Sequence, residues 1–198
     1  MTWKLLGKKT VLKTFRSSVQ SWKMRLPNGR VRDFFISAGY SFVVVFVLDT
    51  KGRVVILKQH YIGQHKKLVS LVAGIIDENE KAGKTARREL LEETGYAAKR
   101  FVYLGKSIKG KYSTGDIHHF LALDASKVQE SELEDTEDIE VQAVTMREFK
   151  KLLDEGKMPD AFAEVCAYRA LEYLDNKESS SLATRSLRSK FPRERKFI

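Results

Sequence analysis

The chain has 198 residues, with 36 Lys or Arg against 26 Asp or Glu and 42% hydrophobic residues. This composition is typical of one soluble globular domain with a few added elements, and it excludes a disordered chain. No apolar run approaches the roughly 18 residues of a membrane-spanning helix, and the basic N-terminus lacks the apolar segment of a signal peptide. We therefore expect a cytoplasmic protein. Cys166 is the only cysteine, which excludes an intramolecular disulfide, and its helical spacing from Phe162 and Ala170 predicts a core residue.

An N-terminal β extension is expected over residues 1–38. Within it, residues 21–26 and 31–37 have the pattern of strands. Between them lies the turn sequence Pro27-Asn28-Gly29-Arg30, so the two strands are predicted to form a hairpin.

Residues 39–175 are expected to form the main domain, an α/β fold with a mixed sheet flanked by helices. The strand that includes residues 42–47 is apolar on both faces, which predicts a central strand covered on both sides. The predicted elements are, in chain order, strands at 40–48 and 54–59, a helix at 84–94, strands at 100–107, 118–123 and 140–144, and helices at 146–155 and 160–174.

The last segment, residues 176–198, is a basic tail with seven Lys or Arg and two Glu. It has little apolar periodicity, so we expect it to be mobile when alone. Its charge, like the net charge of +10, has two interpretations: a solvated surface that aids solubility, or a surface that attracts polyphosphates and nucleic acid.

Three carboxylates are predicted to crowd one face of the helix at 84–94. At about 100° per residue, Glu89, Glu92 and Glu93 fall within roughly a 100° arc. Like charges at these spacings repel, and a divalent cation such as Mg²⁺ or Mn²⁺ would neutralise them. Arg88 is placed to pair with Glu92 or with Glu80, which would hold a carboxylate in one rotamer. The alternative is a solvated acidic helix face.

The segment from Gly74 to Tyr96 resembles the Nudix box, G-x5-E-x7-R-E-U-x-E-E-x-G-U, where U is aliphatic or aromatic. The matching positions are Gly74, Glu80, Arg88, Glu89, Leu90, Glu92, Glu93, Gly95 and Tyr96. The resemblance implies the Nudix fold, an α/β/α sandwich with a mixed sheet, and hydrolysis of a pyrophosphate bond with Mg²⁺.

The resemblance also implies roles for individual residues. Glu89, Glu92 and Glu93 would be metal ligands, with the carbonyl of Gly74 as a further ligand. Glu80 would support the metal cluster, and Arg88 would orient a glutamate of the box. A carboxylate would position the attacking water or remove its proton.

The sequences that flank the box resemble the ADP-ribose and nucleotide-sugar pyrophosphatase subgroup. An acidic stretch at residues 134–141 is similar to a loop of the subgroup that supplies a further metal ligand or the catalytic base. By position we favour Glu137 for both roles, with Asp135 or Glu134 as the second candidate. ADP-ribose is therefore the expected substrate, with related nucleoside diphosphate sugars as alternatives.

The resemblance further implies a homodimer, because the N-terminal strands of the subgroup reach across to a second subunit. Trp22 lies on such a strand, where it would stack on the base or pack in the dimer core. Gln59 and Tyr112 are the other predicted substrate-binding residues. The segment Gln59-His60-Tyr61-Ile62 departs from the subgroup's Gln-Tyr-Arg-like sequence, and Tyr112 resembles a tyrosine of dinucleoside polyphosphate hydrolases.

Two other functions stay open. One is a pyrophosphohydrolase that acts on RNA 5′ ends or dinucleoside polyphosphates, which the basic charge and tail favour. The other is a non-catalytic ADP-ribose sensor that regulates DNA, which the intact box and the short tail oppose.

Overall fold

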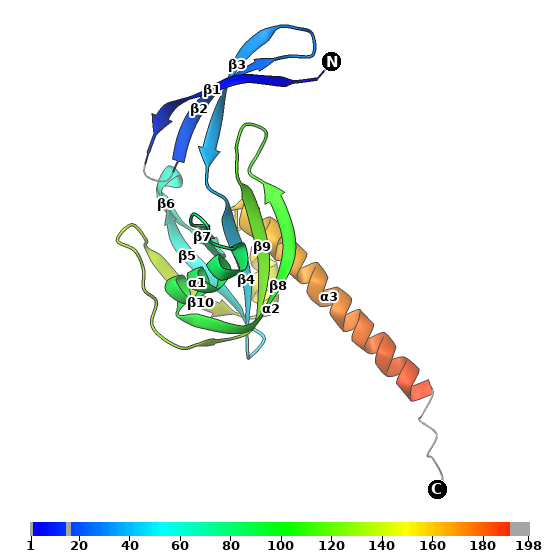
Figure 1. Cartoon of the computed structure of the whole chain (residues 1–198). Helices are drawn as coiled ribbons and strands as arrows, with labels where there is room; N and C mark the ends of the chain where they lie inside the picture. Colours follow the sequence, from blue (N-terminus) through cyan, green and yellow to red (C-terminus); the bar gives the residue numbers. More distant parts are fainter. Residues whose placement is uncertain (1, 15–16, 191–198) are drawn as a thin grey trace.

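The computed structural model describes the backbone of residues 2–14 and 17–190, and the side chains of these residues up to Lys177 (Figure 1). The first three strands form a separate antiparallel sheet: β1 (Lys4–Lys13), β2 (Ser17–Arg25) and β3 (Val31–Gly39). The predicted hairpin is confirmed, and its turn is closed by a bond from Gly29 N to Leu26 O (2.9 Å), with Gly29 at φ +81°. The sequence did not predict β1, because register shifts on both sides of residues 7–10 break its period of two.

The two faces of this N-terminal sheet differ in exposure and in chemistry. Trp22 and Phe34 lie opposite each other on one face and are half-buried, whereas Lys23, Arg25 and Phe35 on the other face are exposed. The half-buried face contacts the loop that follows β8, because Phe34 stacks on Tyr112 with ring centroids 6.2 Å apart.

A second, seven-stranded sheet forms the main domain, in the order β10-β5-β4-β9-β8 with β6 paired to β5 and β7 paired to β4. Its strands are β4 (Phe42–Asp49), β5 (Val54–Tyr61), β6 (Lys66–Ser70), β7 (Val72–Ile75), β8 (Tyr96–Ile108), β9 (Asp116–Lys127) and β10 (Ile139–Val144). The pair β4–β9 is parallel and the others are antiparallel, so the sheet is mixed. Every strand that we predicted in this domain is present.

Helices cover both faces of the second sheet (Figure 1): α1 (Ala82–Thr94) lies on one face, and α2 (Met146–Asp154) and α3 (Ala161–Lys190) lie on the other. A single-turn 3-10 helix, η1 (Ile62–Gln64), joins β5 to β6. This arrangement is the expected α/β/α sandwich.

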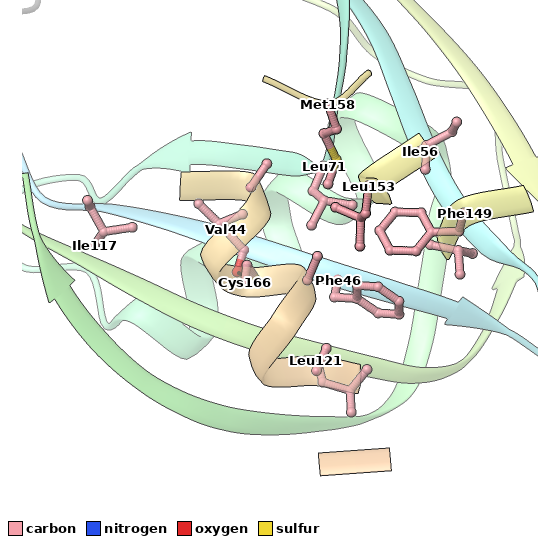
Figure 2. Close-up of a cluster of buried hydrophobic side chains, with 14 of the residues drawn as sticks. Val44, Phe46, Ile56, Leu71, Ile117, Leu121, Phe149, Leu153, Met158 and Cys166 are labelled. Carbon is pink, nitrogen blue, oxygen red and sulfur yellow. Dashed lines mark hydrogen bonds between the residues drawn. The ribbon is translucent and has the colours of Figure 1, made fainter. Parts of the chain in front are cut away.

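Two hydrophobic cores fill the sandwich, one on each side of β4. Val43, Val45 and Val47 point into the core beneath α1, whereas Val44 and Phe46 point into the core beneath α2 and α3 (Figure 2). β4 is therefore the doubly covered central strand that its apolar run predicts. Cys166 is fully buried in the second of these cores, as expected.

The C-terminal helix is longer than predicted. We expected it to end at residue 174, but α3 continues to Lys190 and runs away from the sandwich (Figure 1). Neither Gly nor Pro occurs between residues 161 and 190, so no residue forces a stop where the apolar periodicity ends. Most of the expected mobile tail is thus helical, and residues 191–198 lie outside the described residues. None of the helices described is long and apolar enough to cross a membrane.

Phe149 tests the core beneath α2. Its fully buried ring packs edge-on against Phe46, with centroids 5.1 Å apart at 90°. We expect Phe149→Ala to lower the free energy of unfolding by about 3–5 kcal/mol, since the cavity left behind cannot close. Urea denaturation followed by circular dichroism measures this, with Lys150→Ala on the exposed face of α2 as the control. Equal stability of the two variants would contradict the packing described.

Candidate active site

A cavity of about 780 Å³ opens where β4, β7, α1 and the loop before β10 meet. Tyr40 and Phe42 belong to its lining, and among the described residues Arg88 is the only basic one that lines it. The acidic residues in the lining are Asp77, Glu78, Glu89, Glu92, Glu93, Glu132, Glu134 and Glu137. The cavity is therefore a strongly negative site with an aromatic edge.

Helix α1 presents the predicted carboxylate face to this cavity. Glu89 and Glu93 are 8% and 3% exposed, while Ala86 and Leu90, on another side of the helix, are fully buried in the core. The helix ends at Gly95, which has φ +71° and bonds back to Leu91 O, as the box predicts. The amphipathic pattern read from the sequence is thus confirmed.

Gly74 on β7 makes room for the Glu89 carboxylate. A Cβ atom built at Gly74 would lie 1.8 Å from Cδ of Glu89, so no larger residue fits without displacing that side chain. The glycine is needed here for space, since its backbone must lie directly against a carboxylate. The sequence predicted that the Gly74 backbone approaches a ligand; within the chain its close neighbour is the Glu89 side chain, and the contact with a ligand stays a prediction.

The two buried glutamates are held where their charge is unfavourable. Glu93 accepts a hydrogen bond from Ala73 N (3.1 Å), but burial and the nearby charge of Glu89 raise its pKa well above the usual value. Burial also raises the pKa of Glu89 to about 7. Arg88 lowers this pKa in part, whereas the charges of Glu92 and Glu137 raise it further. These carboxylates need a counter-charge to ionise together.

Arg88 supplies part of that counter-charge. Its guanidinium lies 2.8 Å from both Glu89 and Glu92, 3.0 Å from Glu80, and 3.2 Å from Ile75 O. Glu80 does not line the cavity; it is buried behind Arg88 and also accepts a bond from Thr85 Oγ1 (2.9 Å). Both partners predicted for Arg88 are therefore present, and the pKa of Glu80 is lowered chiefly by its hydrogen bond to Arg88.

The acidic loop between β9 and β10 closes the other side of the cavity. Its backbone is fixed to the end of α1, with Glu132 N donating to Glu92 O and Val128 N to Gly95 O (2.8 Å each). Glu137 is brought to the cavity as the resemblance implies, and its Oε2 accepts a bond from Glu134 N (3.0 Å). Of the two second candidates, Glu134 lines the cavity and Asp135 does not.

The three predicted substrate-binding residues do not line this cavity within one chain. Trp22 lies on β2, where its Nε1 donates to Gln20 Oε1 (2.8 Å). Tyr112 stacks on Phe34, and Gln59 lies on β5 between β10 and β6. Within one chain, the structure therefore does not bring these three residues together with the carboxylates of the box.

Several cavity residues were not predicted from the sequence. Asp77 and Glu78 occupy variable positions of the box, and Glu132 lies in the acidic loop, so their charge alone was a usable signal. The sequence gives no sign that Tyr40 and Phe42 line the cavity, because aromatic residues at the beginning of a buried strand are common in any hydrophobic core.

The donor set of the cavity fits a divalent cation. Carboxylate oxygens and the Gly74 backbone are hard donors, and the buried, mutually repelling Glu89 and Glu93 gain most from a positive charge. No three His, Cys, Asp or Glu side chains in the described part of the chain already surround one point. This agrees with the observed pairings, since Glu92 is bonded to Arg88 and Glu93 to Ala73 N.

Comparison with known proteins agrees with this geometry. Residues 39–165 match the NUDIX domain family. An ADP-ribose pyrophosphatase of Bacillus subtilis (strain 168) is 32% identical over 158 residues, covering 79% of this chain and 83% of that protein. A methanol dehydrogenase activator of Bacillus methanolicus is 25% identical over the same shares of the two chains. The crystal structure of an ADP compounds hydrolase superposes with a TM-score of 0.77 at 20% identity, covering 89% of this chain and 96% of that chain, and supports the fold.

The α/β/α sandwich with a carboxylate cavity built on its box helix is that of a Nudix domain. The domain match and the 32% identity show that the chain belongs to the NUDIX family, and it is a Nudix hydrolase.

Glu93→Gln tests the buried carboxylate of the site. The amide keeps the shape and loses the charge, so we expect kcat to fall by at least about a hundredfold while the melting temperature changes little. Steady-state kinetics on the best substrate of a nucleotide panel measures this. Glu130→Gln is the matched control, because the side chain of Glu130 is 89% exposed and does not line the cavity. Wild-type turnover in Glu93→Gln would show that Glu93 has no role in catalysis.

Proposed function

We propose that the chain hydrolyses the pyrophosphate bond of ADP-ribose or a related nucleoside diphosphate sugar in a Mg²⁺-dependent reaction. ADP-ribose would give AMP and ribose 5-phosphate. The observation that carries the proposal is the cavity in which three of the four box glutamates, Glu89, Glu92 and Glu93, face an acidic loop. The choice of ADP-ribose is supported by the relative from Bacillus subtilis, which is an ADP-ribose pyrophosphatase.

Glu89, Glu92, Glu93, Glu137 and the Gly74 carbonyl would hold the cation, with Mg²⁺ favoured and Mn²⁺ as the alternative. When bound, the cation would supply the positive charge that neutralises the pyrophosphate and makes a neighbouring water more acidic. Glu89 and Glu92 pair with Arg88, and they would give up part of that ion pairing when they bind the cation.

Side chains of the protein would orient the carboxylates and accept the proton of the attacking water. Arg88, fixed by Glu80, orients Glu89 and Glu92. Glu137 would accept the proton of the attacking water, since its carboxylate is half-buried at the cavity and oriented by Glu134 N.

The direct test is product analysis. Purified protein with ADP-ribose and Mg²⁺ should release AMP and ribose 5-phosphate, separated by ion-exchange chromatography. Excess EDTA should abolish the release, and added Mg²⁺ or Mn²⁺ should restore it, because the buried carboxylates would lack their counter-charge. Full activity in excess chelator would overturn the metal-dependent mechanism.

A second candidate function is the hydrolysis of RNA 5′ ends or dinucleoside polyphosphates. One observation favours it: residues 1–39 contain nine Lys or Arg and one Asp, a local charge of +8. These substrates are highly anionic and would be attracted by such a sheet. Release of pyrophosphate from a 5′-triphosphorylated RNA, at a higher kcat/KM than for ADP-ribose, would favour this candidate.

We also propose a homodimer in which the N-terminal sheet of one protomer approaches the active site of its partner. The described residues of β1 are all exposed, including Leu5 and Leu12, and the sheet is basic where the cavity is acidic. Exposed apolar side chains on a sheet favour packing on a second surface. Trp22 would then help to hold the nucleotide base.

Trp22→Ala should raise KM by about fivefold with a smaller change in kcat, because a stacking contact of about 1 kcal/mol is similar in the ground and transition states. Trp22→Phe, which keeps an aromatic face, should stay close to wild type. Light scattering should give the mass of two chains for all three proteins. A measured mass of one chain would contradict the proposed dimer. An unchanged KM in folded Trp22→Ala would show that Trp22 only packs and does not bind the base.

A further inference from the structure

Lys109 contacts the two aromatic residues that line the cavity, Tyr40 and Phe42. It follows the end of β8, and its ammonium donates a hydrogen bond to the backbone carbonyl of Tyr40. The same ammonium lies 4.9 Å from the ring centroid of Phe42. Tyr40 and Phe42 both line the cavity, so Lys109, which is not itself among the lining residues, lies next to two residues that are.

The loop that carries Lys109 is tied to the strands beside the cavity. Thr114 N donates to Ser37 O (3.0 Å), and Asp116 N donates to Ser41 Oγ (3.0 Å). Gly115 has φ +84°, and a Cβ atom there would lie 2.7 Å from Tyr40 O, so the loop passes directly against the residue that Lys109 contacts. The position of the ammonium is therefore set by the fold.

The charge of Lys109 has no acidic partner among the side chains that the structure describes. Within the described residues no carboxylate lies at ion-pair distance from it, whereas Lys106, three residues earlier, pairs with Asp116 at 2.5 Å. Lys109 is half-buried, and burial lowers the pKa of its ammonium. A partly desolvated cation gains free energy when an anion completes its contacts. The Lys109 ammonium has three N–H donors, and its bond to the carbonyl of Tyr40 uses only one of them.

The cavity also needs such a charge. In the part of the chain that the structure describes, eight acidic residues and one basic residue line it. That basic residue, Arg88, is bonded to carboxylates of the cavity and to Glu80. A substrate with two phosphates entering this site meets repulsion that a cation at the rim would reduce. Lys109 is a basic side chain that directly contacts two of the lining residues, Tyr40 and Phe42.

We propose that Lys109 binds a phosphate of the substrate at the aromatic rim of the cavity, as a specificity-determining contact for phosphoanhydrides. The inference rests on the proposed function, since it takes the ligand to be a pyrophosphate derivative. A compact ammonium suits a phosphate oxygen, and a fixed one gives up little side-chain entropy when the ligand binds. Phe42 and Tyr40 act as positioning residues that hold it there.

The test compares three variants of the full-length protein. Lys109→Met keeps the aliphatic cover over Phe42 and removes the charge, and Lys109→Arg keeps the charge. Lys111→Met is the matched control, because Lys111 is exposed in the same loop and does not contact the cavity lining. The readouts are the affinities for ADP, AMP and ribose 5-phosphate by titration calorimetry with Mg²⁺, and KM and kcat on the best substrate.

Lys109→Met should weaken ADP binding about tenfold and raise KM by a similar factor, with kcat less affected. The difference from wild type should shrink as NaCl is raised from about 50 to 500 mM, because salt screens a partly exposed charge. Lys109→Arg should retain most of the affinity and Lys111→Met all of it. For AMP and for ribose 5-phosphate, the affinity of Lys109→Met is compared with that of the wild type. The ligand that loses more affinity identifies the half of the substrate that Lys109 contacts.

Two results would overturn the inference. Equal ADP affinity in Lys109→Met and Lys111→Met would show that the charge binds no phosphate. Equal losses in Lys109→Met and Lys109→Arg, with lowered melting temperatures, would show that Lys109 only packs on Phe42. The proposed function fails separately: if ADP-ribose is not cleaved but Lys109→Met still weakens ADP binding, the phosphate contact stands and the substrate assignment does not.

Discussion

The site depends on carboxylates that are buried close together despite their mutual repulsion. Glu89 and Glu93 lie on one side of α1 with little exposure, and their pKa values are raised because burial disfavours the charged form. Arg88 offsets only part of this cost, since its guanidinium is shared among several carboxylates. The cavity therefore favours the binding of positive charge, because its buried carboxylates repel one another and Arg88 neutralises them only in part.

The fold supplies the rigidity that this crowding requires. α1 packs on its own core through Ala86 and Leu90, and β4 separates that core from the one beneath α2 and α3. β7, which pairs with β4, places Gly74 against Glu89, so the strand and the helix meet at the carboxylate itself. A helix that could shift outward would relieve the repulsion, and burial of its apolar face prevents this movement.

The sequence predicted those parts of the site that depend on local spacing. The helical face, the Arg88 pairs and the helix stop at Gly95 follow from intervals of a few residues, and the structure confirms them. The aromatic rim could not be predicted, because Tyr40 and Lys109 are far apart in the chain and meet only when the loop after β8 folds back on β3 and β4. Likewise β1 and the extension of α3 lack the regular apolar pattern by which elements are recognised.

The distribution of charge shows why the N-terminal sheet matters to the site. Residues 1–39 have a charge of +8, whereas residues 40–175 contain 20 Lys or Arg and 23 Asp or Glu, a charge of −3. The basic sheet is joined to the acidic domain by Phe34 and Tyr112, and its exposed face points away from that contact. An anionic substrate would be attracted by the basic sheet and repelled by the acidic wall of the cavity. Lys109 lies at this boundary, where the loop from the acidic domain contacts the strands that continue from the basic sheet.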